Sequence, residues 1–150
     1  MEFNGQTEIP LARQKVWDAL NDIAVLKECI PGCEQLDWVG DHELEAAITT
    51  KIGPVKAKFK GSITLEDLNE PKSYTLFGQG KGGAAGFAKG KAHVSLEELG
   101  DDMTTLTFEI DASVGGKLAQ IGARLIKGST QKLADQFFEK FKDVAIEKHG

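Results

Sequence analysis

The sequence predicts a single α+β domain in which a curved antiparallel sheet of about seven strands wraps around a long C-terminal helix. Residues 36–114 alternate between apolar and polar side chains in successive short runs, which is typical of strands with one buried face. From Lys117 to about Glu147 the apolar residues recur at helical spacing instead. The length of 150 residues suits one domain, so we expect residues 1–150 to share one core.

The N-terminal region is predicted to form one strand followed by two short helices. Glu2–Ile9 alternates between apolar and polar residues, as a half-buried strand does. Pro10 ends this strand and suits the approach to a helix. Apolar residues at helical spacing then indicate a helix around 16–20 and a second one at 23–30, before the break at 31–32.

Six further strands are expected before the long helix. In the clearest of them, 55–65, apolar residues and glycine alternate strictly with lysine, serine and threonine. Glycine, proline, asparagine and aspartate mark the turns between the strands. The expected strands lie around 36–38, 44–48, 55–65, 73–80, 84–99 and 103–114.

The C-terminal segment 117–147 contains no proline and is predicted to be one continuous helix. Such a helix would be about 46 Å long and stable only with its apolar stripe buried, and the sheet is the partner that can bury it. The stripe consists of Leu118, Ile121, Leu125, Ile126, Leu133, Phe137, Phe141 and Val144.

Charge and composition exclude several classes of function. The net charge is −5 and the one short basic run, 56–60, alternates along a strand, so we expect no nucleic-acid partner. No stretch has the length and apolarity of a membrane span, and the N-terminus lacks the layout of a secretion signal. We therefore expect a cytoplasmic protein in which Cys29 and Cys33 are free thiols.

Small residues on the inner sheet face favour a cavity between the sheet and the long helix. Glycine and alanine recur at alternate positions of 78–92, and a core of large side chains would pack without such gaps. An apolar void stays dry and can accept an apolar guest. The alternative is that the glycines mark bends that let the sheet curl. The expected lining is Phe59, Phe77 or Phe87, Gly86, Gly90, Phe108, Leu118, Ile121 and Leu125.

Three glycine-rich turns are expected at the same end of the sheet, near the start of the long helix. In an antiparallel meander, alternate turns lie at one end, and mobile loops around one opening would form a portal. For any single loop, the simpler interpretation is that glycine is a turn residue. The predicted portal consists of Gly53, Pro54, Gly82, Gly83, Gly115 and Gly116.

We identify no catalytic residue and no metal site in the sequence. His42, His93 and His149 are dispersed, and none has a nearby serine, cysteine or carboxylate partner in the sequence. The two cysteines have no second cysteine or histidine cluster with which to hold zinc. A buried His93 beside a carboxylate would instead favour an enzyme, and a filled core would favour a protein-binding adaptor.

Several motifs resemble the CoxG family, named for the G subunit of carbon monoxide dehydrogenase, and the likeness runs nearly from end to end. The most specific is Gly-Gly-Lys-Leu-Ala-Gln at 115–120, and the Phe137-Phe138 pair fits as well. The other matching segments are 29–34 (Cys-Ile-Pro-Gly-Cys-Glu), 52–55 (Ile-Gly-Pro-Val), 59–61 (Phe-Lys-Gly) and the remainder of 114–126.

This resemblance implies a START-like helix-grip fold that encloses a hydrophobic cavity. It further implies a non-catalytic accessory subunit of a molybdenum hydroxylase such as aerobic carbon monoxide dehydrogenase, acting in membrane recruitment or electron delivery. The implied ligand is an apolar small molecule, either a menaquinone- or ubiquinone-like molecule or another lipid, with no covalently bound cofactor. Peripheral contact with the inner face of the membrane is a further implication. The alternative within the superfamily is an enzyme of the polyketide cyclase or hydrolase type.

Overall fold

The computed structural model describes residues 1–150 and confirms the predicted architecture. All seven strands pair antiparallel in one sheet of order β1-β7-β6-β5-β4-β3-β2. The return of β7 beside β1 follows from the two helices that separate β1 from β2. The strands are β1 Glu2–Ile9, β2 Cys33–Gly40, β3 Glu43–Ile52, β4 Val55–Asn69, β5 Ser73–Lys81, β6 Phe87–Glu98 and β7 Thr104–Gly115.

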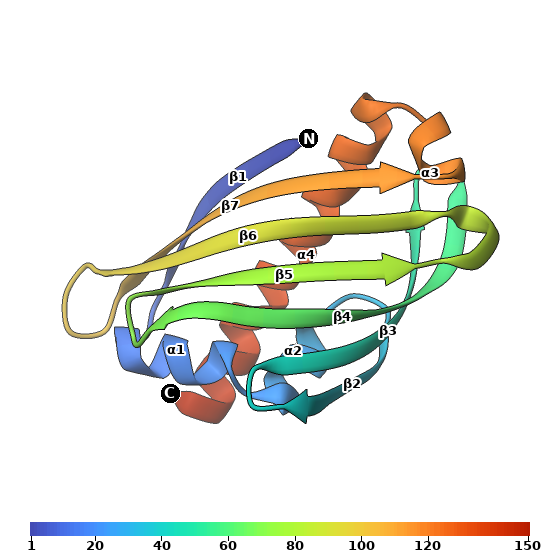
Figure 1. Ribbon diagram of the computed structural model, residues 1–150. Helices are drawn as coiled ribbons and strands as arrows, with labels where there is room; N and C mark the ends of the chain where they lie inside the picture. Colours follow the sequence, from blue (N-terminus) through green and yellow to red (C-terminus); the bar gives the residue numbers. More distant parts are fainter.

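The helices cover one face of this sheet. The long helix α4, Ala123–His149, crosses behind the strands, and α1 (Arg13–Leu20) and α2 (Ile23–Cys29) lie near its C-terminal end (Figure 1). Asp22 caps α2 by accepting a hydrogen bond from the Ala24 backbone N–H at 3.0 Å. The covered face therefore lies between β-strands on one side and three helices on the other.

The long helix differs from the prediction at its beginning. A short helix α3, Lys117–Gln120, ends before Gly122, and α4 starts only after it. Gly122 has φ +92°, a left-handed conformation that an α-helix cannot contain and that glycine adopts without steric cost. The expected strand 84–99 is likewise shorter, because Gly83–Ala85 forms a 3₁₀ turn, η1, before β6.

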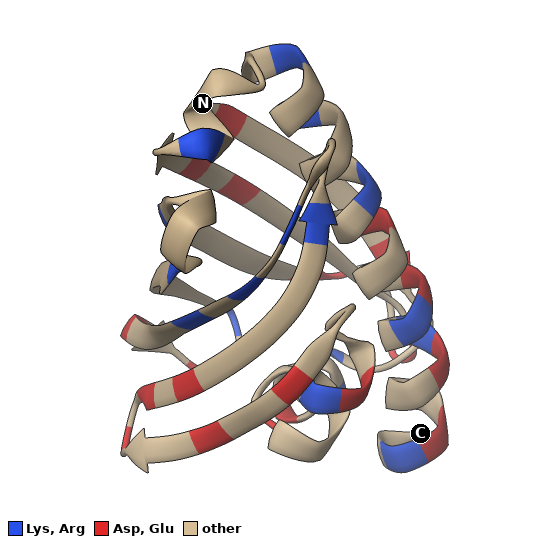
Figure 2. Ribbon diagram, turned by 90° about the vertical axis from the view of Figure 1, so that its right-hand side faces the viewer, with Lys and Arg blue, Asp and Glu red and all other residues tan.

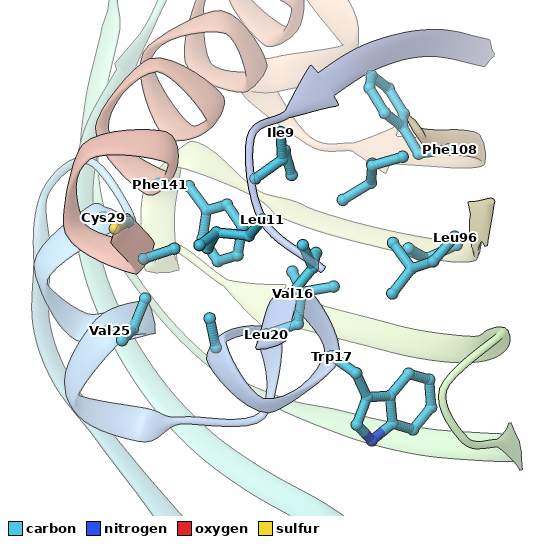
Figure 3. Packing of buried hydrophobic residues seen from close by; sticks show 14 of the residues in the cluster. Ile9, Leu11, Val16, Trp17, Leu20, Val25, Cys29, Leu96, Phe108 and Phe141 are labelled. Carbon is cyan, nitrogen blue, oxygen red and sulfur yellow. The ribbon is translucent and has the colours of Figure 1, made fainter. Parts of the chain in front are cut away.

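The main core lies where α1, α2 and the C-terminal half of α4 meet the sheet. Phe141 of α4 is fully buried, and Figure 3 shows it directed into one cluster with Leu11 and Val16. Its ring stacks on Phe137 with centroids 5.6 Å apart. The N-terminal half of α4 is less well anchored, and the Leu125 side chain is 52% exposed.

Charged side chains are segregated along three of the strands. On β3, glutamates at 43 and 45 precede Lys51, and on β6 lysines at 89 and 91 precede glutamates at 97 and 98. On β4, the lysines of 56–60 precede the acidic residues 66–67. Because neighbouring strands are antiparallel, the lysines of all three lie toward one end of the sheet and the carboxylates toward the other (Figure 2).

Candidate functional site: an apolar cavity

An apolar cavity of about 290 Å³ lies between the sheet and the helices. It is at the small end of the size range of small-molecule pockets. Every residue that lines it is hydrophobic, and the lining comes from the regions of α1, α2 and α4 and from every strand except β1. The lining residues are Leu20, Leu26, Ile30, Leu36, Trp38, Leu44, Ile63, Leu65, Tyr74, Leu76, Ala92, Val94, Leu106, Phe108, Ile110, Ala134, Phe137 and Phe138.

Aromatic rings and small residues together account for the cavity. Phe138 of α4 stacks on Phe108 of β7 with centroids 5.2 Å apart, and this contact sets the distance between the helix and the sheet. Ala92 of β6 and Ala134 of α4 are also in the lining and reach only a short way into the intervening space. Large rings at one point and methyl groups at others leave volume that the core does not fill.

Only two lining residues carry a polar atom in their side chains. Tyr74 of β5 is 5% exposed, and its ring packs edge-on against Trp17 at 5.4 Å. Burial raises the pKa of the Tyr74 hydroxyl well above its usual range. Trp38 of β2 is 38% exposed, so it marks a side on which the apolar cavity approaches solvent. The cavity is suited to holding an apolar molecule and has no acid–base pair in its walls.

Of the residues predicted to line a cavity, only Phe108 lines this one. Phe77 and Phe87 alternate with the inner-face residues of their strands and are exposed on the outer face. The ammonium group of Lys91 lies 5.2 Å from the centroid of the Phe77 ring. Leu125 is exposed because the N-terminal half of α4 does not press against the sheet.

The remaining predicted lining residues lie beyond the cavity, nearer the start of α4. The ring of Phe59 covers Gly82, where an added Cβ would lie 2.6 Å from it. Gly90 sits on β6 between Gly78 and Ala112, outside the cavity lining. Gly86 has φ +104°, and a Cβ there would collide with the carbonyl oxygen of Gly115. This glycine therefore permits a close backbone contact and does not enlarge a cavity.

The structure brings the predicted portal turns together at one end of the sheet, as expected. We call this region, comprising residues 53–54, 82–86 and 115–122, the glycine-turn end. The turn at 82–86 packs on Gly116, where a Cβ would lie 2.7 Å from the Cα of Gly86. The backbone N–H of Gly53 donates a hydrogen bond to Ser129 Oγ of α4 at 3.0 Å.

Two further predicted residues, Leu118 and Ile121, also lie at the glycine-turn end. Leu118 is fully buried, and an added Cβ on Gly53 would lie 3.2 Å from the Ile121 side chain. From Gly53 to Leu44, which lines the apolar cavity, is roughly 30 Å along β3. That these turns admit a ligand stays a prediction.

The lining residues that the sequence did not indicate come mostly from α2 and β2. Leu26 and Ile30 lie in and just after a short helix whose docking on the sheet is a tertiary contact without a local signal. Tyr74, by contrast, alternates with Leu76 on the inner face of β5, so its position at the start of that apolar series was a usable signal.

The histidines and cysteines lie outside the apolar cavity. His93 is exposed on the outer face, with Nδ1 3.1 Å from Thr75 Oγ1, and His149 Nε2 is 2.8 Å from Asp22 Oδ2. Cys29 and Cys33 are both free, and burial raises the pKa of the Cys29 thiol to about 11. No three histidine, cysteine or acidic side chains are grouped closely enough to hold a metal ion.

An open groove of about 700 Å³ lies on the outer face of the sheet and contrasts with the apolar cavity. Its lining includes Lys60, Lys81, Lys89 and the exposed ring of Phe87. Lys60 and Lys81 are opposite each other on β4 and β5. No helix of the protein has the length and apolarity needed to cross a membrane.

Comparison with solved structures places this fold among START-like proteins. A conserved protein from Geobacillus kaustophilus is 33% identical, with a TM-score of 0.93 over 100% of this chain and 98% of that one. A START superfamily protein from Mycobacterium smegmatis (12% identity, TM-score 0.74) matches over 97% of both chains. The Zhui aromatase/cyclase from Streptomyces sp. R1128 (8% identity, TM-score 0.72) matches over 99% of this chain and 94% of its own.

No curated protein shows significant similarity to the chain. The sequence profile of one family, described as the carbon monoxide dehydrogenase G subunit (CoxG), matches residues 5–146. That match covers nearly the whole domain, including the helices and strands that line the apolar cavity. The chain therefore belongs to the CoxG family of carbon monoxide dehydrogenase subunits.

Proposed function

We propose that the protein is a non-catalytic carrier of a neutral apolar molecule, an isoprenoid quinone or another lipid, and an accessory subunit of a molybdenum hydroxylase such as aerobic carbon monoxide dehydrogenase. The observation that carries the proposal is the apolar cavity with its wholly hydrophobic lining. Burying a hydrocarbon chain contributes about 0.8 kcal/mol per methylene group, so a short buried segment suffices for micromolar binding.

The size of the apolar cavity constrains how such a ligand sits. A volume of about 290 Å³ suits a ring system or a short part of a chain better than a complete isoprenoid lipid. The remainder of a longer ligand would leave the cavity beside Trp38, the most exposed of its lining residues. Partial burial of this kind suits a carrier, because the ligand must be released as well as held.

The proposed partner rests on family membership, and the outer sheet face supplies a surface for it. The family is named as a subunit of carbon monoxide dehydrogenase. The outer groove combines lysines with the exposed rings of Phe77 and Phe87, which suits an acidic partner surface or the anionic inner face of a membrane. The role would be electron delivery by a bound quinone or recruitment of the enzyme to the membrane.

An enzyme of the polyketide cyclase type is the competing interpretation, since an aromatase/cyclase shares the fold. Catalysis would need convergent acidic or basic groups inside the cavity. The cavity walls contain no histidine, cysteine, lysine or carboxylate, and the exposed His93 points away from them. We therefore favour binding without chemistry.

The test is whether the purified protein carries an apolar ligand. Native mass spectrometry and solvent extraction of protein from its own host should recover a quinone or lipid, and quinone titration of the extracted protein should quench Trp38 fluorescence in a saturable manner. Recovery of nothing apolar together with no quinone binding would refute the carrier role. Co-purification of molybdenum hydroxylase subunits with the tagged protein tests the partner separately.

A further inference from the structure

The hydroxyl group of Tyr74 is the one strongly polar side-chain group deep in the apolar cavity. Tyr74 lies on β5 opposite Val94 of β6, and both side chains line the cavity. The residue is 5% exposed, whereas Trp38, the other lining residue with a polar side-chain atom, is 38% exposed. Tyr74 is therefore placed inside, and Trp38 at the edge.

The Tyr74 hydroxyl makes no hydrogen bond within the protein. None of the side-chain hydrogen bonds involves it, and the shift in its pKa has burial as its single cause. The only fully enclosed side-chain polar atom that lacks a partner is Arg13 Nε. The Tyr74 hydroxyl is thus neither bonded nor fully enclosed, so it must reach open space, and the open space beside this buried residue is the cavity that it lines.

A buried hydroxyl without a partner is unfavourable, and a ligand atom that completes it gains the difference. Because burial raises the pKa of this phenol, the group keeps its proton throughout the physiological range and can donate a hydrogen bond. The neighbouring lining residues Leu65, Leu76 and Val94 offer no acceptor of their own in their side chains.

We propose that the apolar cavity recognises a neutral molecule through a carbonyl oxygen that accepts a hydrogen bond from the Tyr74 hydroxyl. This inference rests on the proposed carrier function and narrows its ligand to ketone-, quinone- or ester-like molecules. The carbonyl end enters first, toward Tyr74, and the hydrocarbon part extends toward Trp38.

The walls of the cavity discriminate among the possible acceptors. A carboxylate would have to shed its hydration without any lysine, arginine or histidine in the lining to offset the loss. A ligand hydroxyl could accept from Tyr74 but would bring a second O–H that has no acceptor among hydrophobic side chains. A carbonyl oxygen accepts the Tyr74 proton and leaves no donor unpaired.

The experiment compares two probes of nearly equal shape, 2-acetylnaphthalene and 2-ethylnaphthalene, in the wild type and in Tyr74→Phe. The substitution keeps the ring that packs on Trp17 and removes only the hydroxyl. We expect the ratio of the two affinities, ketone over hydrocarbon, to fall by about three- to tenfold in Tyr74→Phe, with 2-ethylnaphthalene binding unchanged or slightly tighter. Trp38→Phe is the matched control, in which the ratio should stay at the wild-type value.

An unchanged ratio in Tyr74→Phe, or an equal fall in Trp38→Phe, would overturn the inference while leaving the carrier function standing. Failure of both probes to bind the wild type would overturn both proposals. Infrared difference spectra of the bound ketone give a readout that needs no variant. The carbonyl stretch should shift to lower frequency than in alkane solvent, and an alkane-like frequency in the wild-type complex would contradict the hydrogen bond.

Discussion

The apolar cavity and the glycine-turn end are built from opposite kinds of residue, and the cavity lies where the large ones are. Its walls include Phe108, Phe137 and Phe138, whereas the region from which the sequence predicted a cavity carries most of the glycines of the sheet. At the glycine-turn end, a ring or a backbone segment from a neighbour occupies the space of each missing side chain. Phe59 covers Gly82, and Phe87 covers Gly115.

This difference shows that residue size alone does not locate a cavity. A glycine removes volume from one side of a contact, and a protein interior restores its density by moving a neighbour into the gap. A cavity persists only where neighbours are held back, as the stacked rings of Phe138 and Phe108 hold α4 away from β7. The following substitutions test whether the two regions differ in this way.

The largest effect is expected for Phe141→Ala on the cavity side of α4. Removal of this fully buried ring should lower the free energy of unfolding by about 3–5 kcal/mol. Leu125→Ala, on the glycine-turn side of the same helix, should change it by less than about 0.5 kcal/mol because the side chain is largely exposed. Urea unfolding followed by circular dichroism measures both, and equal losses would contradict the unequal anchoring of α4.

A second contrast separates glycines that permit a contact from a glycine that does not. Gly86→Ala should lower the free energy of unfolding by about 1–3 kcal/mol, because an alanine must adopt the φ of +104° and its Cβ meets the Gly115 carbonyl. Gly128→Ala, in α4 with open space around it, should instead raise stability by about 0.5–1 kcal/mol. Thermal denaturation of the two variants compares them, and a neutral Gly86→Ala would show that the turn at 82–86 can move away from Gly115.

The third contrast places the ligand in one region or the other. Ala92→Leu fills the apolar cavity from β6 and should weaken binding of an apolar probe about tenfold or more while the fold survives. Ala88→Leu lies on the same face of the same strand, four residues closer to the glycine-turn end and outside the cavity, and should leave affinity unchanged. The reverse pattern in a probe titration would place the ligand where the sequence predicted it.

The smallest effect concerns the link between the end of α4 and the cap of α2, beside the cavity. A hydrogen bond from His149 lowers the pKa of Asp22 below 3.8, so the folded state favours the ionised carboxyl. This stabilisation is present above that pH and is lost as the pH falls through the lowered value. His149→Gln should therefore cost about 0.2–1 kcal/mol at about pH 5 and less at about pH 3. A cost that is constant with pH would contradict the link.

The sequence predicted the fold well because its signals are local. Strict alternation in 55–65 and helical spacing around Phe137 and Phe141 each depend on residues that lie close together in the chain. The break in the long helix was missed because a glycine within an apolar stripe is also compatible with a continuous helix, and only the left-handed φ of Gly122 decides the matter.

The location of the cavity could not be predicted in the same way because it depends on contacts across the sheet. Whether Phe59 fills the space over Gly82 is decided by the register between β4 and β5. Likewise, Leu26 and Ile30 line the cavity only because α2 docks against α4 and β2. The alternative that glycines serve the shape of the sheet was the better guide for Gly86 and Gly115.

The segregation of charge along β3, β4 and β6 gives the molecule an electric dipole along its strands, although its net charge is −5. A negatively charged surface repels such a molecule at long range but exerts a torque that turns the lysine-bearing end forward as the two approach. Within about 10 Å at physiological salt this local attraction outlasts the repulsion from the distant carboxylates, since screening removes the longer-range term first. The glycine-turn end would therefore arrive first in each encounter, and the rate of productive encounters would depend on ionic strength.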